Sequence, residues 1–277
     1  METTVDPPVK YVTSIGANKW AVNEETNRIS LLDARFYAVG DDYVPSVTTI
    51  LDAYPKGPAF YDWLKRNGQD SDEIRDEAGR RGSIVHELTE LIDRGGTASL
   101  MNEDGSPRYK LSEWAMLSKY VDFRERFPAE IHSIELNLAS KELGYGGTLD
   151  RLMTIGGKLY LVDIKTSASV WPHFWLQLAA YHKLLIHTGA IAAALPASVL
   201  GQMPEIHLAV LHLNSKHKTN GKGDVMQGLG WQLVTQEHPT SHYLNLFEQT
   251  RSLWLAENGN AVPKIISYQL TQTLNKR

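Results

Sequence analysis

The chain has 277 residues, of which 42% are hydrophobic, and a formal net charge of -4 at pH 7. This charge argues against a protein that coats nucleic acid by bulk electrostatic attraction. The absence of cysteine excludes disulfides and thiol catalysis. A chain of this length can bury a sizeable core, and we expect such a core with a helical annex added to it.

The first third of the chain is predicted to form the helical annex. One short strand is expected near residues 35–39. Apolar periodicity and helix start and stop signals then predict helices over residues 47–53, 59–66, 71–93 and 111–126. A polar, glycine-containing loop over residues 95–108 separates the last two of these helices.

The helix predicted over residues 71–93 carries a candidate metal ligand, His86. Gly82 lies four residues before it on the same helical face, where the missing side chain would let a backbone or a substrate approach closely. A histidine that is simply hydrogen-bonded within the protein is the alternative for His86.

A β-hairpin with acidic residues on one face is expected over residues 148–165. Its centre, Gly156-Gly157, is a dipeptide that closes two-residue hairpins, so it predicts the register of the two strands. That register places Asp150 opposite Asp163, with Lys165 on the same face. Opposed like charges destabilise a sheet, and a divalent cation would remove the penalty. The hairpin therefore predicts a metal site, and a strand with its charges in water is the alternative.

Further strands and helices complete a mixed sheet flanked by helices, which makes the fold class α/β. Strands are expected over residues 131–138, 148–155, 158–165, 205–213 and 230–235, and helices over residues 172–187 and 241–256. Gln177 and Tyr181 lie four residues apart on one face of the first helix, so both polar groups could meet the same ligand. The edge of an ordinary helix is the alternative. A loop is expected over residues 216–230.

The chain is expected to form one composite domain with three regions. These are the annex over residues 1–127, the core over 128–258 and a tail over 259–277. The apolar stretch at 190–200 is too short to cross a bilayer and is interrupted by Pro196. Residues 1–8 lack the basic and apolar segments of a secretory signal. We therefore expect an intracellular, cytoplasmic protein with no membrane partner.

Basic and aromatic residues near the predicted site are candidate DNA contacts. Arg80-Arg81 precedes His86 closely, and a second basic group lies within residues 216–222. Trp171 and Trp175 are at helical spacing and could stack on unpaired bases, at roughly 1 to 3 kcal/mol per base. A solvated surface for the basic residues and a core position for the tryptophans are the alternatives.

Taken together, these elements resemble the PD-(D/E)XK nuclease superfamily in its RecB-like branch. Four motifs of that branch occur in the same order here: Gly82-x-x-x-His86, Asp150, Asp163-Ile164-Lys165 and Gln177-x-x-x-Tyr181. Residues 44–51 and 63–68 are similar to the N-terminal signature of phage and mitochondrial-maintenance exonucleases, so the resemblance covers about residues 34–255. The chain departs from the family pattern at Leu149, where the superfamily's name has proline.

The resemblance implies a restriction-endonuclease-like core and a role for each motif residue. His86, Asp150, Asp163 and the Ile164 carbonyl would bind one or two Mg²⁺ or Mn²⁺ ions, and Lys165 would position or activate the attacking water. Gln177 and Tyr181 would hold the nucleotide or support Lys165. Two smaller sets complete the implied site: Glu135 as an additional acidic residue, and Ser46, Thr48, Arg80, Arg81 and Trp175 as candidate DNA contacts. Some relatives hold an iron–sulfur cluster by four cysteines, which this chain lacks.

The function implied by the resemblance is that of a metal-dependent deoxyribonuclease. We expect an exonuclease that hydrolyses single-stranded DNA or DNA ends in replication, recombination or repair, with a recombination or replication protein as a candidate partner. The resemblance to phage enzymes suggests a phage-encoded protein acting in the host cytoplasm. A structure-selective endonuclease and a non-catalytic DNA-binding scaffold on the same fold are the alternatives.

Overall fold

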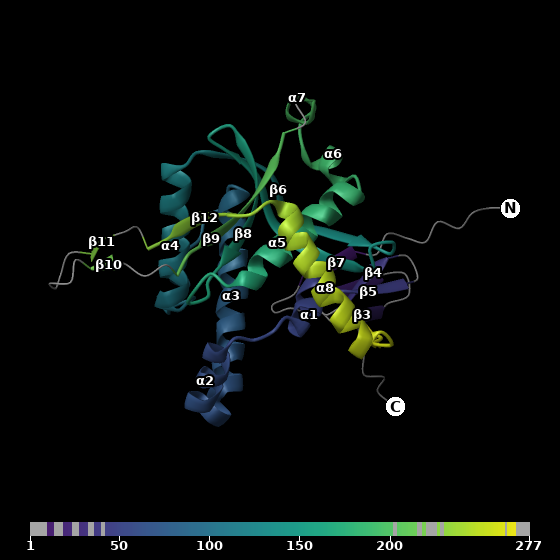
Figure 1. The fold of residues 1–277 in the computed structure, drawn as a ribbon. Helices are drawn as coiled ribbons and strands as arrows, with labels where there is room; N and C mark the ends of the chain where they lie inside the picture. The colour runs from purple at the N-terminus through teal and green to yellow at the C-terminus, as the bar shows by residue number, and fades with distance from the viewer. Residues whose placement is uncertain are drawn as a thin grey trace, which may run out of the picture.

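A five-stranded mixed sheet flanked by helices forms the centre of the computed structural model (Figure 1). The structure describes residues 10–13, 19–23, 28–32, 36–39, 42–201, 204–214, 218–219, 226–227, 230–263 and 265–269. The strand order is β12-β9-β8-β7-β6. Its strands are β6 (Ala129–Ser140), β7 (Tyr145–Ile155), β8 (Lys158–Lys165), β9 (Ile206–His212) and β12 (Gln232–Thr235). Only β8 and β9 are parallel neighbours, and the chain is α/β as predicted.

The β7–β8 hairpin has the register that its glycines predicted. Gly156 and Gly157 both have positive φ, at 57° and 77°, which is the backbone of a type I′ turn. Ile155 pairs with Lys158 next to this turn. The paired residues continue as far as Arg151 and Val162. Asp150 and Asp163 therefore lie one step beyond the last pair, where the two strands begin to separate.

Helices cover both faces of the sheet, and the core has one cluster on each side. On one side, α5 (Pro172–His187) and α8 (Thr240–Asn258) pack with apolar residues such as Leu161. On the other side, α3 (Ser71–Asp93) and α4 (Leu111–Arg126) pack with residues such as Ile164. Helix α5 covers the face of β8 that carries Leu161 and Asp163, so the alternative of a strand with its charges in water does not describe Asp163, which is buried.

The N-terminal third contains more strands than its sequence pattern predicted. Besides β4 (Phe36–Val39), it contributes β5 (Asp42–Pro45), β1 (Lys10–Thr13), β2 (Lys19–Asn23) and β3 (Arg28–Leu32). The predicted tail over residues 259–277 includes β13 (Ile265–Gln269), which pairs antiparallel with β3 in a separate sheet, β1-β2-β3-β13. These strands are only four or five residues long, too short for a clear alternation, and β3 and β13 pair although they lie far apart in the chain.

Most of the predicted helices are confirmed. The bounds of α3, α4 and α5 are those expected, and residues 47–53 form α1 (Val47–Ile50) followed by the 3₁₀ turn η1 (Leu51–Ala53). Helix α2 (Pro58–Asn67) leads through η2 (Gly68–Asp70) into α3. The apolar stretch at 190–200 forms two short helices, α6 (Ala190–Ala194) and α7 (Ala197–Leu200), on either side of Pro196.

The loop expected over residues 216–230 falls largely outside the described residues. Its described parts are the paired strands β10 (Lys218–Thr219) and β11 (Met226–Gln227). Among the helices that the structure describes, none combines the length and apolar character needed to span a membrane.

Candidate metal centre

Three neighbouring strands place acidic residues side by side near the middle of the sheet. The register of β6 against β7 brings Glu135 next to Asp150, and the register of β7 against β8 brings Asp163 to the other side of Asp150. The carboxylate oxygen Oδ2 of Asp150 accepts a hydrogen bond of 2.6 Å from the backbone N–H of Ile164. This bond fixes Asp150 against β8 at the point where the strand pairing ends.

The side chain of His86 reaches this row of acids from α3. Its Nδ1 atom lies 3.4 Å from Oε1 of Glu135 and 3.7 Å from Oδ1 of Asp150, and its Nε2 atom lies 3.0 Å from the carbonyl oxygen of Ile164. One nitrogen or oxygen atom from each of His86, Glu135 and Asp150 lies within 4.8 Å of the others. Three of the four groups that the resemblance implied as metal ligands, His86, Asp150 and the Ile164 carbonyl, therefore lie together, and Glu135 joins them.

Asp163 is engaged differently from the other two acids and is not part of that cluster. Its Oδ1 atom accepts hydrogen bonds from Nζ of Lys165 at 3.1 Å and from Nε2 of Gln177 at 3.2 Å. Its Oδ2 atom lies 2.9 Å from the Lys165 ammonium, yet it is buried without a well-oriented hydrogen bond. The side chain thus carries an acceptor with unused capacity next to the metal-ligand cluster.

Lys165, Gln177 and Tyr181 form a short chain of contacts on the α5 side. Nζ of Lys165 donates to Oε1 of Gln177 at 3.3 Å, and Nε2 of Gln177 donates to the Tyr181 hydroxyl at 3.1 Å. Tyr181 packs so closely on β7 that a Cβ atom at Gly147 would lie 2.1 Å from its ring. The expected shared helix face of Gln177 and Tyr181 is therefore observed, with the two side chains in direct contact, and Gly147 makes room for Tyr181.

Burial and neighbouring charges shift the pKa values of the site residues. Burial alone would lower the pKa of His86, but Asp150 and Glu135 outweigh burial and raise it from 6.5 to about 9. Burial raises the pKa of Asp163 to about 6 despite the adjacent Lys165 ammonium, and burial likewise raises the pKa of Asp150. The cations that contact the three carboxylates are thus the protonated His86, Lys165 and Arg151.

The donor set fits a hard divalent cation. Two carboxylates, one imidazole and one backbone carbonyl converge, and carboxylate and carbonyl oxygens are the ligands of Mg²⁺ and Mn²⁺. The unused oxygen of Asp163 adds an acceptor beside them. A cation held here would act as a Lewis acid and would lower the pKa of a bound water, and Lys165 lies beside it as a proton-bearing group.

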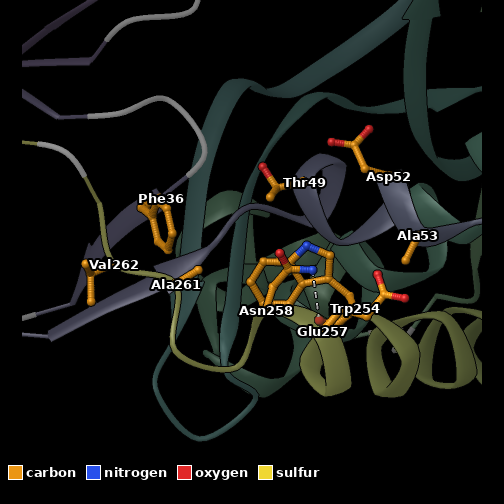
Figure 2. Close-up of a pocket in the computed structure, with 9 residues that line it drawn as sticks. All are labelled: Phe36, Thr49, Asp52, Ala53, Trp254, Glu257, Asn258, Ala261 and Val262. Atoms are coloured by element: carbon orange, nitrogen blue, oxygen red, sulfur yellow. Dashed lines mark hydrogen bonds between the residues drawn. The ribbon is translucent and has the colours of Figure 1, made fainter.

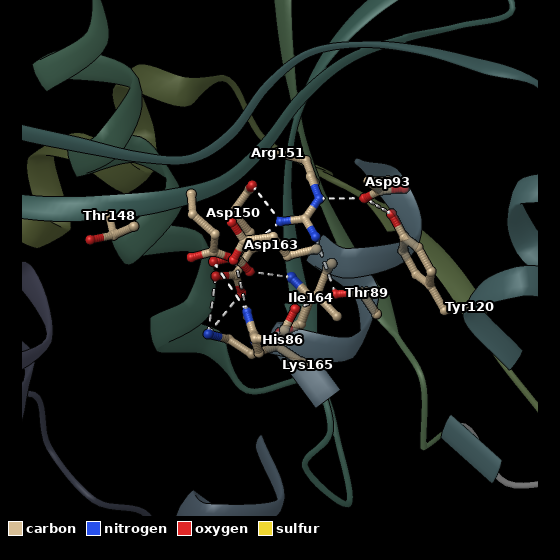
Figure 3. Close-up of polar contacts among 12 residues, drawn as sticks. His86, Thr89, Asp93, Tyr120, Thr148, Asp150, Arg151, Asp163, Ile164 and Lys165 are labelled. Carbon is tan, nitrogen blue, oxygen red and sulfur yellow. Dashed lines mark hydrogen bonds and ion pairs between the residues drawn. The ribbon is translucent and has the colours of Figure 1, made fainter. Parts of the chain in front are cut away.

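A buried ionic network supports the acids from the α3 and α4 side (Figure 3). Arg151, fully buried, donates from Nε to Oδ2 of Asp93 at 2.7 Å, and Asp93 also contacts Arg124 and the Tyr120 hydroxyl. The residue pattern did not single out this network. Its signal was the position of Arg151 directly after Asp150, on the side of β7 that faces the core, where an unpaired charge is not tolerated.

The candidate DNA contacts have varied environments. Ser46 is only 4% exposed and is the N-cap of α1, where its hydroxyl accepts from the Thr49 N–H at 3.0 Å, so it is not available at the surface as predicted. Thr48 is exposed. Trp175 is partly buried and packs against Tyr243, with ring centroids 5.9 Å apart, so the alternative of a core position describes it.

The basic residues near His86 are only partly free. Arg80 is paired with Glu77 and with the buried Glu113, at 2.9 and 2.6 Å. Arg81 is half-buried, and its Nε atom makes no hydrogen bond with the described residues. In the second basic group, Lys218 lies in β10, and residues 216, 217 and 222 lie outside the described residues.

Gly82 lies where a small side chain would fit. A Cβ atom there would meet the Thr166 hydroxyl oxygen at 3.6 Å, an ordinary contact. Packing within the chain therefore does not require glycine at this position, and the expected close approach of another backbone is not observed. That a substrate approaches closely at Gly82 stays a prediction.

A pocket of about 280 Å³ lies elsewhere, between β4, η1 and the C-terminal end of α8 (Figure 2). Its lining includes Phe36, Trp254, Asp52 and Glu257, and it contains none of the metal-centre residues. The candidate site therefore depends on convergent polar groups and not on this pocket.

Searches of protein-family models and of curated proteins found no match to this chain.

Proposed function

We propose that this chain is a metal-dependent deoxyribonuclease of the RecB-like branch of the PD-(D/E)XK superfamily, with a restriction-endonuclease-like core. One observation carries the proposal. His86, Glu135, Asp150 and the Ile164 carbonyl converge beside an Asp163–Lys165 pair on adjacent strands of a mixed sheet. The order of the motif residues in the sequence and the convergence of this set in space are the two observations that support the proposal.

In this proposal His86, Glu135, Asp150 and the Ile164 carbonyl hold Mg²⁺ or Mn²⁺. When bound by these residues, Mg²⁺ or Mn²⁺ would supply a Lewis acid for the scissile phosphate and would lower the pKa of a bound water. Lys165 orients that water and stabilises the negative charge that develops on the phosphate. Its position 3.1 Å from Asp163 keeps the ammonium next to the reacting groups.

Gln177 and Tyr181 serve to keep Lys165 in place. The amide of Gln177 contacts both Lys165 and Asp163, and it is itself held by the Tyr181 hydroxyl. The Lys165 ammonium also lies 4.7 Å from the centroid of the Phe174 ring, a cation–π contact that further limits its motion. Because Lys165 is 19% exposed, a substrate phosphate can reach it.

The proposed activity is that of an exonuclease on single strands or DNA ends. Its direct test is digestion of end-labelled DNA, single- and double-stranded, linear and circular, with Mg²⁺, Mn²⁺ or EDTA. Lys165→Ala and Asp163→Ala are compared with Lys158→Ala, a matched control because Lys158 is exposed at the opposite end of the same strand. We expect metal-dependent loss of linear DNA that both site variants abolish and the control retains.

Other outcomes of this experiment lead to different conclusions. Cleavage of circular DNA would replace the exonuclease by the structure-selective endonuclease. Binding of DNA by the folded wild type without cleavage under any metal would support the scaffold. Cleavage that survives in both Lys165→Ala and Asp163→Ala would contradict the assigned site.

A further inference from the structure

We infer that Arg151 is a positioning residue that holds Glu135 in the metal centre. This inference rests on the proposed function, because it assigns a task to Arg151 within the same site. It begins with the backbone of Glu135, whose φ of 48° makes it the non-glycine residue with positive φ among those the structure describes. Such a conformation is strained and persists only where the surroundings enforce it.

The strand pairing does not enforce the conformation of Glu135. Ile134 pairs with Arg151 and Leu136 pairs with Leu149, while Glu135 between them is not paired. Because its backbone leaves the regular pleat, the alternation of a strand does not determine where its side chain points. Side-chain contacts must therefore hold the Glu135 carboxylate next to Asp150 and His86.

Arg151 makes the contact that can do this from the interior. Its Nη1 atom donates to Oε1 of Glu135 at 3.0 Å and to the backbone carbonyl of Asp150 at 2.8 Å. Its Nη2 atom donates to the Thr89 hydroxyl at 3.1 Å and its Nε atom to Asp93 at 2.7 Å. A planar guanidinium with donors directed at four acceptors has no freedom to move, so it fixes the Glu135 carboxylate relative to Asp150.

Charge strengthens the same contact. Asp93 is the carboxylate shared by Arg151 and Arg124, so one negative and two positive groups leave one excess positive charge in the buried network. Arg151 also contacts the partly exposed Glu135. The excess charge lies next to Glu135, where it offsets the repulsion between the Glu135 and Asp150 carboxylates.

Two contacts of the Oε1 atom define the position of Glu135 relative to His86. Oε1 of Glu135 accepts from Arg151 on one side and lies 3.4 Å from Nδ1 of His86 on the other. Without Arg151, Glu135 would retain the His86 contact alone, and its strained backbone could relax back toward the pleat. Residues that orient metal ligands in this way typically contribute about 10- to 100-fold to metal affinity.

The test measures Mn²⁺ binding to the DNA-free protein by electron paramagnetic resonance of the free ion. Arg151→Lys keeps one positive charge but cannot reach four acceptors. Arg124→Lys is the matched control, because Arg124 contacts Asp93 and the Ala129 carbonyl in the same network but not Glu135. We expect the Mn²⁺ dissociation constant to rise about tenfold or more in Arg151→Lys and to stay within about twofold of wild type in Arg124→Lys. Thermal unfolding in EDTA reports the loss of stability in both variants.

A double substitution shows whether Arg151 acts through Glu135. Glu135→Gln should weaken Mn²⁺ binding in the wild type and add little in the Arg151→Lys background, because the carboxylate there is already misplaced. If Arg151→Lys does not fold, Thr89→Val removes one hydrogen bond of Arg151 and should raise the dissociation constant in the same direction, by a few-fold.

The two proposals fail in distinguishable ways. Wild-type protein that neither binds Mn²⁺ nor cleaves DNA would overturn the proposed function. Wild-type protein that binds Mn²⁺, with Arg151→Lys equal to Arg124→Lys or with independent effects of Arg151→Lys and Glu135→Gln, would overturn the positioning role alone.

Discussion

The row of acids in the centre of the sheet is supported by a different cationic network on each side. On the α5 side, Lys165 is 19% exposed and is held by Asp163, Gln177 and the Phe174 ring. On the α3 and α4 side, Arg151 is fully buried and is held by Asp93 and Thr89.

The difference separates two tasks. An amine that must reach a phosphate and exchange a proton needs access to solvent, and lysine can do both. A cation that only orients a carboxylate is best buried and planar, with each donor directed at an acceptor, and arginine has that geometry. The α5 side with Lys165, here called the open side, is thus suited to chemistry. The α3 and α4 side with Arg151, here called the closed side, is suited to holding the acids rigidly.

The largest expected effect tests the closed side. Asp93→Ala would leave the guanidiniums of Arg151 and Arg124 without their shared carboxylate in the core, and breaking a buried pair in this way costs about 3–5 kcal/mol. Urea unfolding in EDTA measures the loss. Glu90→Ala on the same helix is the control, because its exposed pair with Arg94 contributes about 0.2–1 kcal/mol. Equal losses in the two variants would mean that the buried network does not stabilise the fold.

A pH effect of intermediate size tests the charge balance between the two sides. The folded metal-free protein holds a proton on His86 up to a pKa of about 9, against an ordinary value of 6.5. This stabilisation, at most about 3 kcal/mol, is fully present below pH 6.5 and is lost as the pH rises through 9.

The free energy of unfolding, measured in EDTA from pH 6 to pH 10, should therefore decrease as the pH rises. This decrease should be smaller in His86→Gln than in the wild type. A variant whose stability falls as steeply as that of the wild type would show that Asp150 and Glu135 do not hold a protonated His86.

A smaller effect tests the packing of the open side. Gly147→Ala would place a methyl group 2.1 Å from the Tyr181 ring, and such overpacking typically costs about 1–3 kcal/mol. Thermal unfolding and DNA cleavage should both decline, since Tyr181 holds Gln177 and through it Lys165.

Gly82→Ala is the contrasting variant, because its methyl group has space and alanine favours a helix by about 1 kcal/mol. We expect its stability to be unchanged or higher. Reduced cleavage in this stable variant would show that a substrate approaches α3 at Gly82, whereas unchanged cleavage would remove Gly82 from the site.

Local sequence signals determined the elements of the core and the outline of the site. Apolar periodicity predicted the bounds of α3, α4 and α5, and Gly156-Gly157 predicted the hairpin register, because these features depend on interactions between residues close in the chain. The spacing of Gln177 and Tyr181 predicted their shared face for the same reason.

Tertiary structure alone decided which groups meet and which are hidden. The β3–β13 pairing, the bridge between Ser46 and Gly146 and the packing of Trp175 on Tyr243 all depend on segments distant in sequence. So does the strained Glu135, held by an arginine that looks like an ordinary strand residue in the sequence. A contact between distant segments leaves no period in either of them, because its energy is realised only when the sheet and helices are assembled.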